Sequence, residues 1–355
     1  MKKLKRSKPK RILFLYTELS GYIVNCLGFA EKDGYNIHVV KYPLNNEAPF
    51  NFEPYSNINL YERESFKSFL EFKELVVKLN PELIFISGWI DKWYLKIVKS
   101  SSIYSKNILM IDTPWKNSIK QKLWSHYFSL CKKRYFDYVW IPGQPQYKYA
   151  KKLGFRALNI FKGLYTCDEE VFNKTNTNND NNSKIRTFLY VGRYVKEKGI
   201  IELWQTFQKA NAEIKPKWQL WCVGTGELWG NRIIDENIKH FGFIQPKNLS
   251  EIVSKSDVYV MPSKYEPWGV SLHEMISFGK PVLVSENVGS SYCFVKNHIN
   301  GFVFSYSKKN DFINKMRNMM KLSNNELHNM GKESVHLSKV FSKNLWLDTL
   351  NKIYD

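Results

Sequence analysis

The chain has no uninterrupted apolar run that approaches the roughly 20 residues a membrane-spanning helix needs. Its N-terminus is basic, but no apolar stretch follows that is long enough for a signal peptide. The sequence therefore predicts a cytoplasmic protein. Disorder as the overall state is excluded too, because 43% of the residues are hydrophobic and only 24% are charged.

Cysteine is scarce and follows no pairing pattern. The five cysteines are widely spaced and no Cys-x-x-Cys occurs, which excludes a disulfide framework and a cysteine-based zinc site. We expect all five to be small core side chains in a reducing compartment: Cys26, Cys131, Cys167, Cys222 and Cys293. The sequence also lacks an Asp-x-Asp motif.

Acidic residues are outnumbered, and unevenly so. Lys and Arg total 53 against 33 Asp and Glu, a net charge of +20. Residues 1–165 hold 28 basic and 13 acidic residues, whereas residues 166–355 hold 25 and 20. This asymmetry predicts that the first half faces an anionic partner. Nucleic acid, an anionic membrane surface and a phosphorylated substrate all satisfy it, and charge alone does not choose among them.

At 355 residues the chain is too long for one ordinary core, since single cores stop growing at roughly 250–300 residues. Short β-branched or aromatic runs alternate with helical patterns, which predicts parallel, doubly wound sheets. In the first half, strands are expected at 12–16, 37–40, 83–86, 108–111 and 138–141. One helix is expected to end near residue 33 and another to span 65–79. In the second half, strands are expected at 188–191, 218–223, 258–261, 281–284 and 301–304, with helices at 200–212 and 272–278.

We therefore predict two successive Rossmann-like α/β domains with a cleft between them. The first covers residues 1–165, and a linker region at 166–186 contains an Asn-rich stretch without apolar residues. The second domain covers residues 187–340. A final helix within 341–355 is able to pack on either domain, including a crossing back to the first.

The most informative stretch runs from Pro262 to Glu274, after a predicted strand and into a helix. It carries Glu266, Glu274 and the main-chain amides of residues 268–270, where the helix begins. Free amides and the positive end of the helix dipole attract phosphate, and Gly269 allows close approach of a ligand. The pattern is equally typical of a helix N-terminus that carries an acidic residue for purely structural reasons.

Two further loops follow predicted strands. Gly192 is followed by Arg193 and Lys198, which would place a planar fork and a point charge beside a diphosphate. Ligands bind at this end of strands in open parallel sheets. A solvated loop that happens to be cationic is the alternative. Gly224 begins a Gly-Thr-Gly turn, and glycines in such turns most often serve a positive φ.

In this order, the three stretches resemble the C-terminal half of family-four retaining glycosyltransferases (glycosyl transferases group 1) of the surface-polysaccharide type. The resemblance runs from about Thr187 to Phe304. It implies the GT-B fold, in which an N-terminal acceptor-binding domain precedes a nucleotide-sugar donor domain. It also implies catalysis without a metal ion or other cofactor, since the Asp-x-Asp motif of metal-dependent glycosyltransferases is absent.

The resemblance also implies roles for individual residues. Arg193 and Lys198 would bind the donor diphosphate and stabilise the charge that develops on it. Glu266 would hold the transferred sugar, and Glu274 would accept hydrogen bonds from the ribose hydroxyls. The main chain at Ile244 would contact the base. The remaining donor-binding residues would be Gly192, Gly224, Trp268, Gly269 and Val270.

The N-terminal half matches the family less closely. Gly21 lies where the family's glycine loop approaches the donor, although the usual paired glycines are absent. Many relatives have a His after the strand that corresponds to 108–111, but this chain has Asp112 there. Asp112 could orient an acceptor hydroxyl, or it could cap a helix that opens at Pro114.

Residues 115–136 interleave basic and aromatic side chains, which suits an anionic bilayer surface. A core-packed helix with a wet basic face is the alternative.

We predict a retaining glycosyltransferase that is peripheral at the inner face of the cytoplasmic membrane. It would move a sugar from a nucleotide donor, UDP-linked by preference, to a lipid-linked glycan. The alternatives are a GT-B epimerase or phosphorylase and, in another class, a basic nucleic-acid-binding protein.

Overall fold

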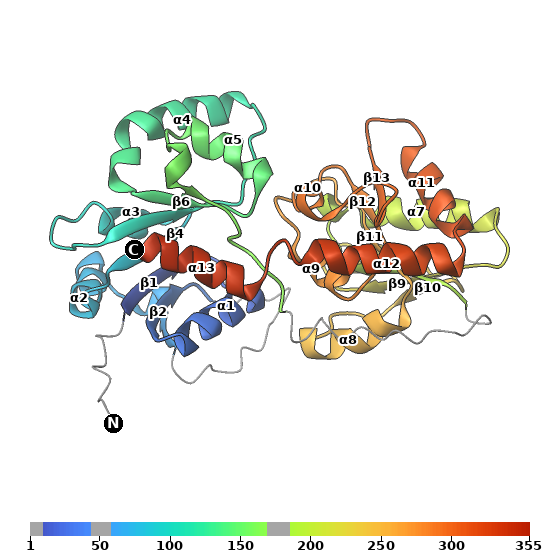
Figure 1. The fold of residues 1–355 in the computed structure, drawn as a ribbon, viewed down its shortest axis with the longest axis horizontal. Helices are drawn as coiled ribbons and strands as arrows, with labels where there is room; N and C mark the ends of the chain where they lie inside the picture. Colours follow the sequence, from blue (N-terminus) through green and yellow to red (C-terminus); the bar gives the residue numbers. More distant parts are fainter. Residues whose placement is uncertain (1–9, 44–57, 169–184) are drawn as a thin grey trace. The chain divides into compact units, whose positions relative to one another are not determined.

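The computed structural model describes residues 10–43, 58–168 and 185–355 and divides the chain into two compact units (Figure 1). The first unit comprises the chain up to Tyr165 together with Lys343–Asp355. The second comprises Thr166–Ser342. The Asn-rich stretch that we expected to be a solvated loop lies outside the described residues.

The first unit is built on a seven-stranded parallel sheet in the order β3-β2-β1-β4-β5-β6-β7. The strands are β1 (Lys10–Tyr16), β2 (Tyr35–Lys41), β3 (Asn59–Glu62), β4 (Leu83–Ser87), β5 (Lys106–Met110), β6 (Tyr138–Trp140) and β7 (Ile160–Phe161). The order reverses between β1 and β4, the kind of position where doubly wound sheets bind ligands.

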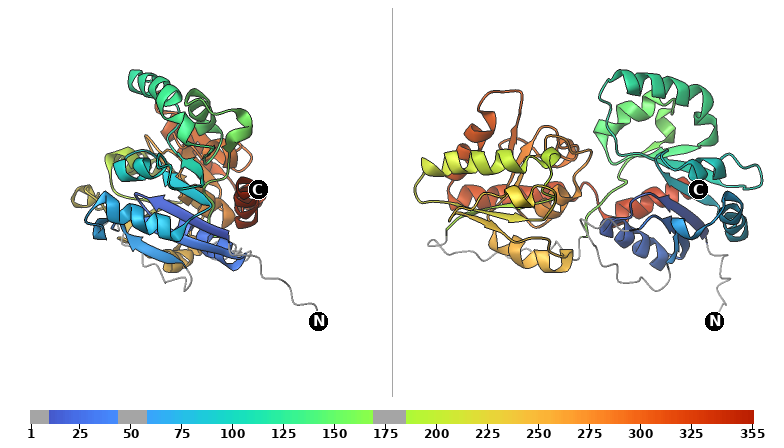
Figure 2. Two further views of the ribbon diagram at one scale, coloured as in Figure 1. Left: turned by 90° about the vertical axis from the view of Figure 1, so that its left-hand side faces the viewer. Right: turned by 180° about the vertical axis from the view of Figure 1, so that it is seen from behind.

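Helices cover both faces of this sheet (Figures 1 and 2). They are α1 (Gly21–Lys32), α2 (Phe69–Leu79), α3 (Lys92–Ile97), α4 (Ile119–Cys131), α5 (Gln144–Lys152) and α13 (Lys343–Tyr354). Alternate residues of β1 face the two layers. Ile12 and Phe14 pack towards α1 and α13, whereas Leu13 and Leu15 pack with α2 to α5. A strand buried on both faces explains the continuous apolar run in the sequence.

The C-terminal helix α13 belongs to the first unit. Its Trp346 is buried, and the indole N–H donates to the carbonyl of Leu164 at 3.1 Å. Tyr35 donates to Asn351 in the same helix. Helix α13 therefore completes the core that β1, β2 and α1 form.

The second unit has a six-stranded parallel sheet in the order β10-β9-β8-β11-β12-β13. Its strands are β8 (Thr187–Val191), β9 (Gln219–Val223), β10 (Ile238–His240), β11 (Val258–Met261), β12 (Val282–Ser285) and β13 (Gly301–Phe304). Its helices are α7 (Ile200–Ala212), α8 (Pro246–Lys255), α9 (Val270–Ser277), α10 (Ser291–Phe294), α11 (Asp311–Lys321) and α12 (Asn324–Ser338). Helices α7 and α9 lie on opposite faces of this sheet (Figures 1 and 2).

The structure corrects three expectations. The helix expected at 65–79 begins at Phe69, because the Ser68 side chain accepts from the amide of Glu71 and caps it. No helix opens at Pro114, so Asp112 is not its cap; α4 begins at Ile119 and Ser118 caps it. Cys131 is exposed at the end of α4 rather than buried in a core.

None of the helices within residues 10–43, 58–168 and 185–355 is long and apolar enough to cross a membrane.

Candidate active site

The residues predicted to bind the donor, apart from Gly21, lie in the second unit. Val270 and Glu274 belong to α9, and the others lie on loops that follow strand ends. Arg193 follows β8, Gly224 follows β9, Ile244 follows β10 and Glu266 follows β11. Since these four strands are adjacent and parallel, the four loops share the carboxyl edge of one sheet.

Lys198 and Glu266, which are 68 positions apart, form an ion pair between Nζ and Oε2. Their side chains are only 22% and 11% exposed, so solvent screens the pair less than it would a surface pair. The backbone fixes the pair as well, because the amide of Lys264 donates to the carbonyl of Glu197 at 2.8 Å. The two side chains thus lie together, and their service in one donor site stays a prediction.

Gly199 lets the two loops approach each other. Its φ is 68°, and a Cβ there would lie 2.1 Å from the carbonyl oxygen of Pro262. Any other residue would push apart the loops that bear Lys198 and Glu266.

The amide N–H groups of Trp268, Gly269 and Val270 have no hydrogen-bond acceptor among the residues that the structure describes. They lie at the N-terminus of α9, where such groups are normally left over. Gly269 has a φ of 93°, and a Cβ there would lie 3.0 Å from Cγ of Glu266. The free amides and the Glu266 side chain are therefore neighbours, a combination suited to a phosphate and a sugar hydroxyl.

Trp268 itself is buried, and its ring packs against Phe294 and Phe341 at centroid distances of 6.0 Å. Its side chain anchors the loop, and only its main chain is available to a ligand.

Glu274 lies on the fifth residue of α9 and is partly buried. Burial, with a further contribution from the negative charge of Asp168, raises the pKa of Glu274 to about 7. Within the described parts of the chain no group donates a hydrogen bond to its carboxylate. A carboxylate without donors matches the predicted role of accepting hydrogen bonds from ribose hydroxyls.

The glycine-bearing loops pack tightly on one another. The amide of Gly192 donates to Val223 at 3.0 Å, and the amide of Gly224 donates to Gly242 at 2.7 Å. Gly224 has a φ of 134°, and a Cβ there would lie 1.9 Å from the carbonyl oxygen of Gly192. The conformational explanation of the Gly-x-Gly turn therefore holds, and donor contact by Gly192 and Gly224 stays a prediction.

Arg193 is exposed beside these loops, and its carbonyl accepts a hydrogen bond from Tyr190 at 2.7 Å. Ile244 lines an open hollow of about 720 Å³ between the edge of the sheet and α8. Trp221, Phe241 and Phe243 supply its aromatic wall. The hollow adjoins the predicted base loop and lies apart from the Lys198–Glu266 pair along the sheet.

The two first-unit candidates, Gly21 and Asp112, share the carboxyl edge of the seven-stranded sheet. Tyr22 packs edge-on against Tyr165 at 5.4 Å, and the Tyr165 hydroxyl lies 3.5 Å from the Asp112 carboxylate. A Cβ on Gly21 would meet no atom of the described residues within 4 Å, so among them the main chain there is open to approach.

Sequence reasoning missed His273, the neighbour of Glu274. Its Nδ1 accepts the amide N–H of Cys167 at 3.2 Å, and its Nε2–H donates to Ser338 at 2.9 Å. Burial lowers the pKa of His273 to about 4, so the ring stays neutral. His273 thereby links the segment after Tyr165 and the end of α12 to α9. No local sequence pattern indicates such a link.

Known proteins resemble this chain in sequence and in fold. Residues 171–336 match the family model described as Glycosyl transferases group 1. An uncharacterized glycosyltransferase of Methanocaldococcus jannaschii is 30% identical over 135 residues, 36% of this chain and 34% of that protein. The UDP-Gal:alpha-D-GlcNAc-diphosphoundecaprenol alpha-1,3-galactosyltransferase of Escherichia coli is 34% identical over 98 residues, 26% of this chain and 25% of that protein. The matches thus span about a third or less of these relatives.

Among solved structures, a glycosyltransferase from Rickettsia africae matches with a TM-score of 0.76 and 15% identity over 98% of each chain. That likeness shows the fold, which is GT-B: two Rossmann-like parallel α/β domains in succession. The predicted fold class is confirmed. Within residues 171–336 the chain is similar to the glycosyl transferases group 1 family.

Proposed function

We propose that this protein is a retaining glycosyltransferase that moves a sugar from a nucleotide-sugar donor to a lipid-linked glycan in bacterial surface-polysaccharide synthesis. The observation that carries the proposal is the Lys198–Glu266 pair beside the three free amides of residues 268–270. A cation, a sugar-binding carboxylate and phosphate-binding amides are thereby combined at one sheet edge.

Catalysis follows from the charge of the leaving group. A nucleoside diphosphate gathers negative charge as the glycosyl bond breaks, and preorganised cations and N–H donors stabilise that charge. Arg193 and Lys198 supply the cations, so that no divalent ion is required. Retention is expected by attack from the leaving-group side, with the departing phosphate taking the proton of the acceptor hydroxyl. Glu266 then positions the sugar.

The choice of donor and acceptor has support from relatives. The name of the Escherichia coli relative specifies UDP-Gal as donor and a diphosphoundecaprenol-linked sugar as acceptor. We infer a UDP-sugar and a lipid-linked acceptor for this chain by that analogy.

A thermal-shift panel of UDP, GDP, ADP and dTDP tests the donor site. A ligand at 100 times its Kd stabilises by about 2.7 kcal/mol, so the preferred nucleotide stands out. We expect UDP to give the largest shift, Arg193→Ala to lose it, and Arg156→Ala, an exposed arginine of the first unit, to keep it. A full shift in Arg193→Ala would mean that the diphosphate binds elsewhere.

Helix α4 supports peripheral contact with an anionic membrane. Its outer face carries Ile119, Leu123, Tyr127 and Leu130, which are 76%, 69%, 44% and 66% exposed and lie on one stripe at helical spacing. Ser125 and Phe128, on the opposite side, are buried. Figure 1 shows α4 beside α5 at the edge of the first unit. Lys120 and Lys122 of the same helix are exposed as well, so α4 presents apolar and basic side chains to its surroundings together.

The charge around this stripe favours an anionic surface. Residues 113–136 contain six Lys and Arg residues and no Asp or Glu. Each basic residue near an anionic bilayer contributes about 1 kcal/mol to binding. We infer that α4 lies in the headgroup region of the inner leaflet, close to where a lipid-linked acceptor would be presented.

Sedimentation with phosphatidylglycerol vesicles tests this contact. Leu123→Glu removes about 1.5–3 kcal/mol of apolar burial in the bilayer. We therefore expect partitioning onto the vesicles to fall by roughly ten-fold or more. Leu158→Glu, at a residue that is 82% exposed elsewhere in the same unit, is the matched control. Equal binding of both variants, or equal binding of the native protein to uncharged vesicles, would contradict the inference.

A further inference from the structure

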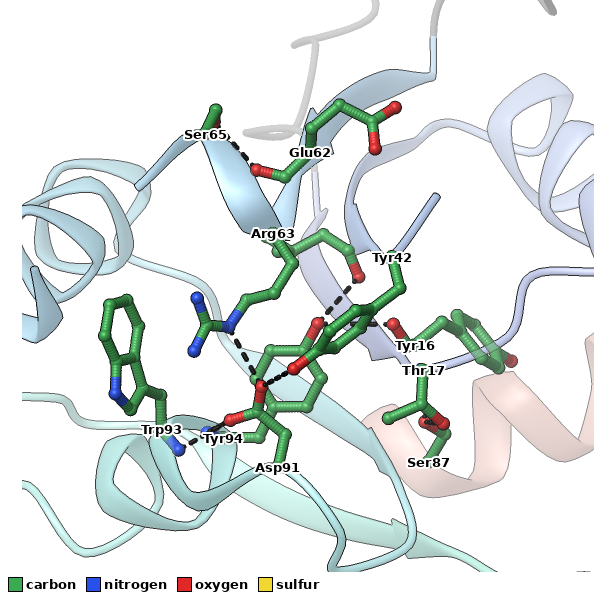
Figure 3. Close-up of polar contacts among 11 residues, drawn as sticks. Tyr16, Thr17, Tyr42, Glu62, Arg63, Ser65, Ser87, Asp91, Trp93 and Tyr94 are labelled. Carbon is green, nitrogen blue, oxygen red and sulfur yellow. Dashed lines mark hydrogen bonds and ion pairs between the residues drawn. The ribbon is translucent and has the colours of Figure 1, made fainter. Parts of the chain in front are cut away.

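A polar cluster lies at the carboxyl ends of β2, β3 and β4 in the first unit (Figure 3). Its centre is Asp91, whose side chain is 2% exposed. One oxygen accepts the amides of Trp93 and Tyr94, at 2.5 and 2.9 Å. The other accepts the Tyr42 hydroxyl at 2.7 Å and Nε of Arg63 at 2.9 Å. Four donors therefore saturate the carboxylate.

Arg63 is held in a fixed pose by this cluster. Its guanidinium lies over the Trp93 ring, 3.6 Å from the centroid, and its side chain is only 11% exposed. Nε faces Asp91, so the two terminal nitrogens point away from it, as Figure 3 shows. Among the described residues neither terminal nitrogen has a hydrogen-bond acceptor.

This arrangement differs from an ordinary structural ion pair. A guanidinium that pairs fully with a carboxylate does so through two parallel N–H bonds, whereas Arg63 commits one and keeps its terminal fork open. The fork is planar and rigid, and stacking on Trp93 removes its remaining freedom. Two oxygens of one oxyanion fit such a fork, and little side-chain entropy would be lost on binding.

We propose that Arg63 binds an oxyanion, a phosphoryl or carboxylate group, carried by the acceptor. The inference rests on the proposed function, because it assigns the acceptor to the first unit. The cluster lies at the carboxyl edge of a doubly wound sheet, beside its switch point, where ligands of such folds bind. Arg63 thereby selects acceptors that carry such a group.

Arginine-selective ¹⁵N NMR on the full-length protein tests the site directly. The chain has nine arginines, so the guanidinium spectrum is sparse. Spectra of Arg63→Lys and Arg193→Ala assign the two signals of interest. The probes are inorganic phosphate, methyl phosphate and glucuronate for the first unit, and UDP for the second.

We expect the Arg63 signals to shift saturably with at least one oxyanion probe. Phosphate or methyl phosphate acting alone identifies a phosphoryl acceptor, and glucuronate acting alone identifies an acidic sugar. An Arg63 signal that no probe moves, while UDP moves Arg193, would overturn this inference and leave the proposed function intact. If UDP leaves Arg193 unmoved, the proposed function fails instead, whatever Arg63 does.

Kinetics separates recognition from a merely structural role. Arg63→Lys keeps the charge near Asp91 but loses the fork, so we expect the acceptor KM to rise about 10–100-fold, the range for a hydrogen bond to a charged group. Slow donor hydrolysis without acceptor should be unchanged. Arg156→Lys is the matched control and should alter neither. Equal loss of both activities in Arg63→Lys would indicate damage to the fold and overturn the assignment.

Discussion

The carboxyl edges of the two sheets both hold a cation against a carboxylate, but they are built differently. At the six-stranded sheet, Lys198 meets Glu266 among loops that touch main chain to main chain. At the seven-stranded sheet, Arg63 meets Asp91 among aromatic side chains. The main-chain contacts of the first edge suit the diphosphate, a group common to all nucleotide donors. At the second edge side chains make the contacts, and substitution can change these one at a time. We infer that donor chemistry is fixed by backbone and acceptor choice by side chains.

Lys198→Ala should have the largest effect, since it removes a fixed cation from the donor edge. We expect kcat to fall about 10²–10³-fold, the scale for deleting one donor to a developing charge. Steady-state transfer from UDP-sugar to acceptor measures it. Lys196→Ala, an exposed lysine in the same turn, is the control. Similar kcat values for the two variants would show that the pairing of Lys198 with Glu266 does not matter for catalysis. The contrast between the two sheet edges would then not hold.

Gly224→Ala tests whether the carboxyl edge of the six-stranded sheet depends on contacts between the main chains of its loops. The new Cβ would lie 1.9 Å from the Gly192 carbonyl at a positive φ, so we expect about 2–3 kcal/mol of destabilisation. Urea unfolding measures it. Gly230→Ala, where a Cβ meets nothing within 4 Å, should change stability far less. A stable Gly224→Ala variant would mean that the loops are not held as tightly as described.

Glu274→Gln should have the smallest effect, visible as a pH dependence. Because burial raises the pKa of Glu274 from 4.5 to about 7, the folded state holds a proton that the unfolded state has released across this window. The native protein should therefore lose stability as pH rises through the window, and the variant should not. Between about pH 5 and about pH 8, we expect the Tm of the variant to gain about 2–4 °C on the native protein.

Glu326→Gln is the control for that pH series. Hydrogen bonds from Ser323 lower the pKa of Glu326, so its titration lies below the window. The Tm difference of this variant should be flat from about pH 5 to about pH 8. A flat Glu274→Gln series would show that its carboxyl is not desolvated.

Much of the fold could be predicted from strand composition. Parallel strands buried on both faces, such as Ile12–Leu15 and Val258–Met261, are continuous apolar runs and therefore visible. The short edge strands β3, β7 and β10 escaped notice, because half-exposed edges such as Asn59–Glu62 have no such run. The misplaced start of α2 reflects a serine cap inside an apolar pattern that continues on both sides.

The site divides in the same way. Lys198 and Glu266 could be predicted because each belongs to a local motif at a strand end. Arg63 could not, since it meets Asp91 only through the spatial order of β3, β2, β1 and β4. Nothing near Arg63 in the sequence marks it, and Asp91 reads as an ordinary helix cap. Pairing that depends on strand order has no local signal.

A crystal structure of the protein soaked with UDP-sugar in the presence of a chelator tests the central claim most directly. We expect both phosphoryl groups to contact Arg193, Lys198 and the amides of residues 268–270. Phosphates that bind only when magnesium is restored, or that lie away from these groups, would contradict it.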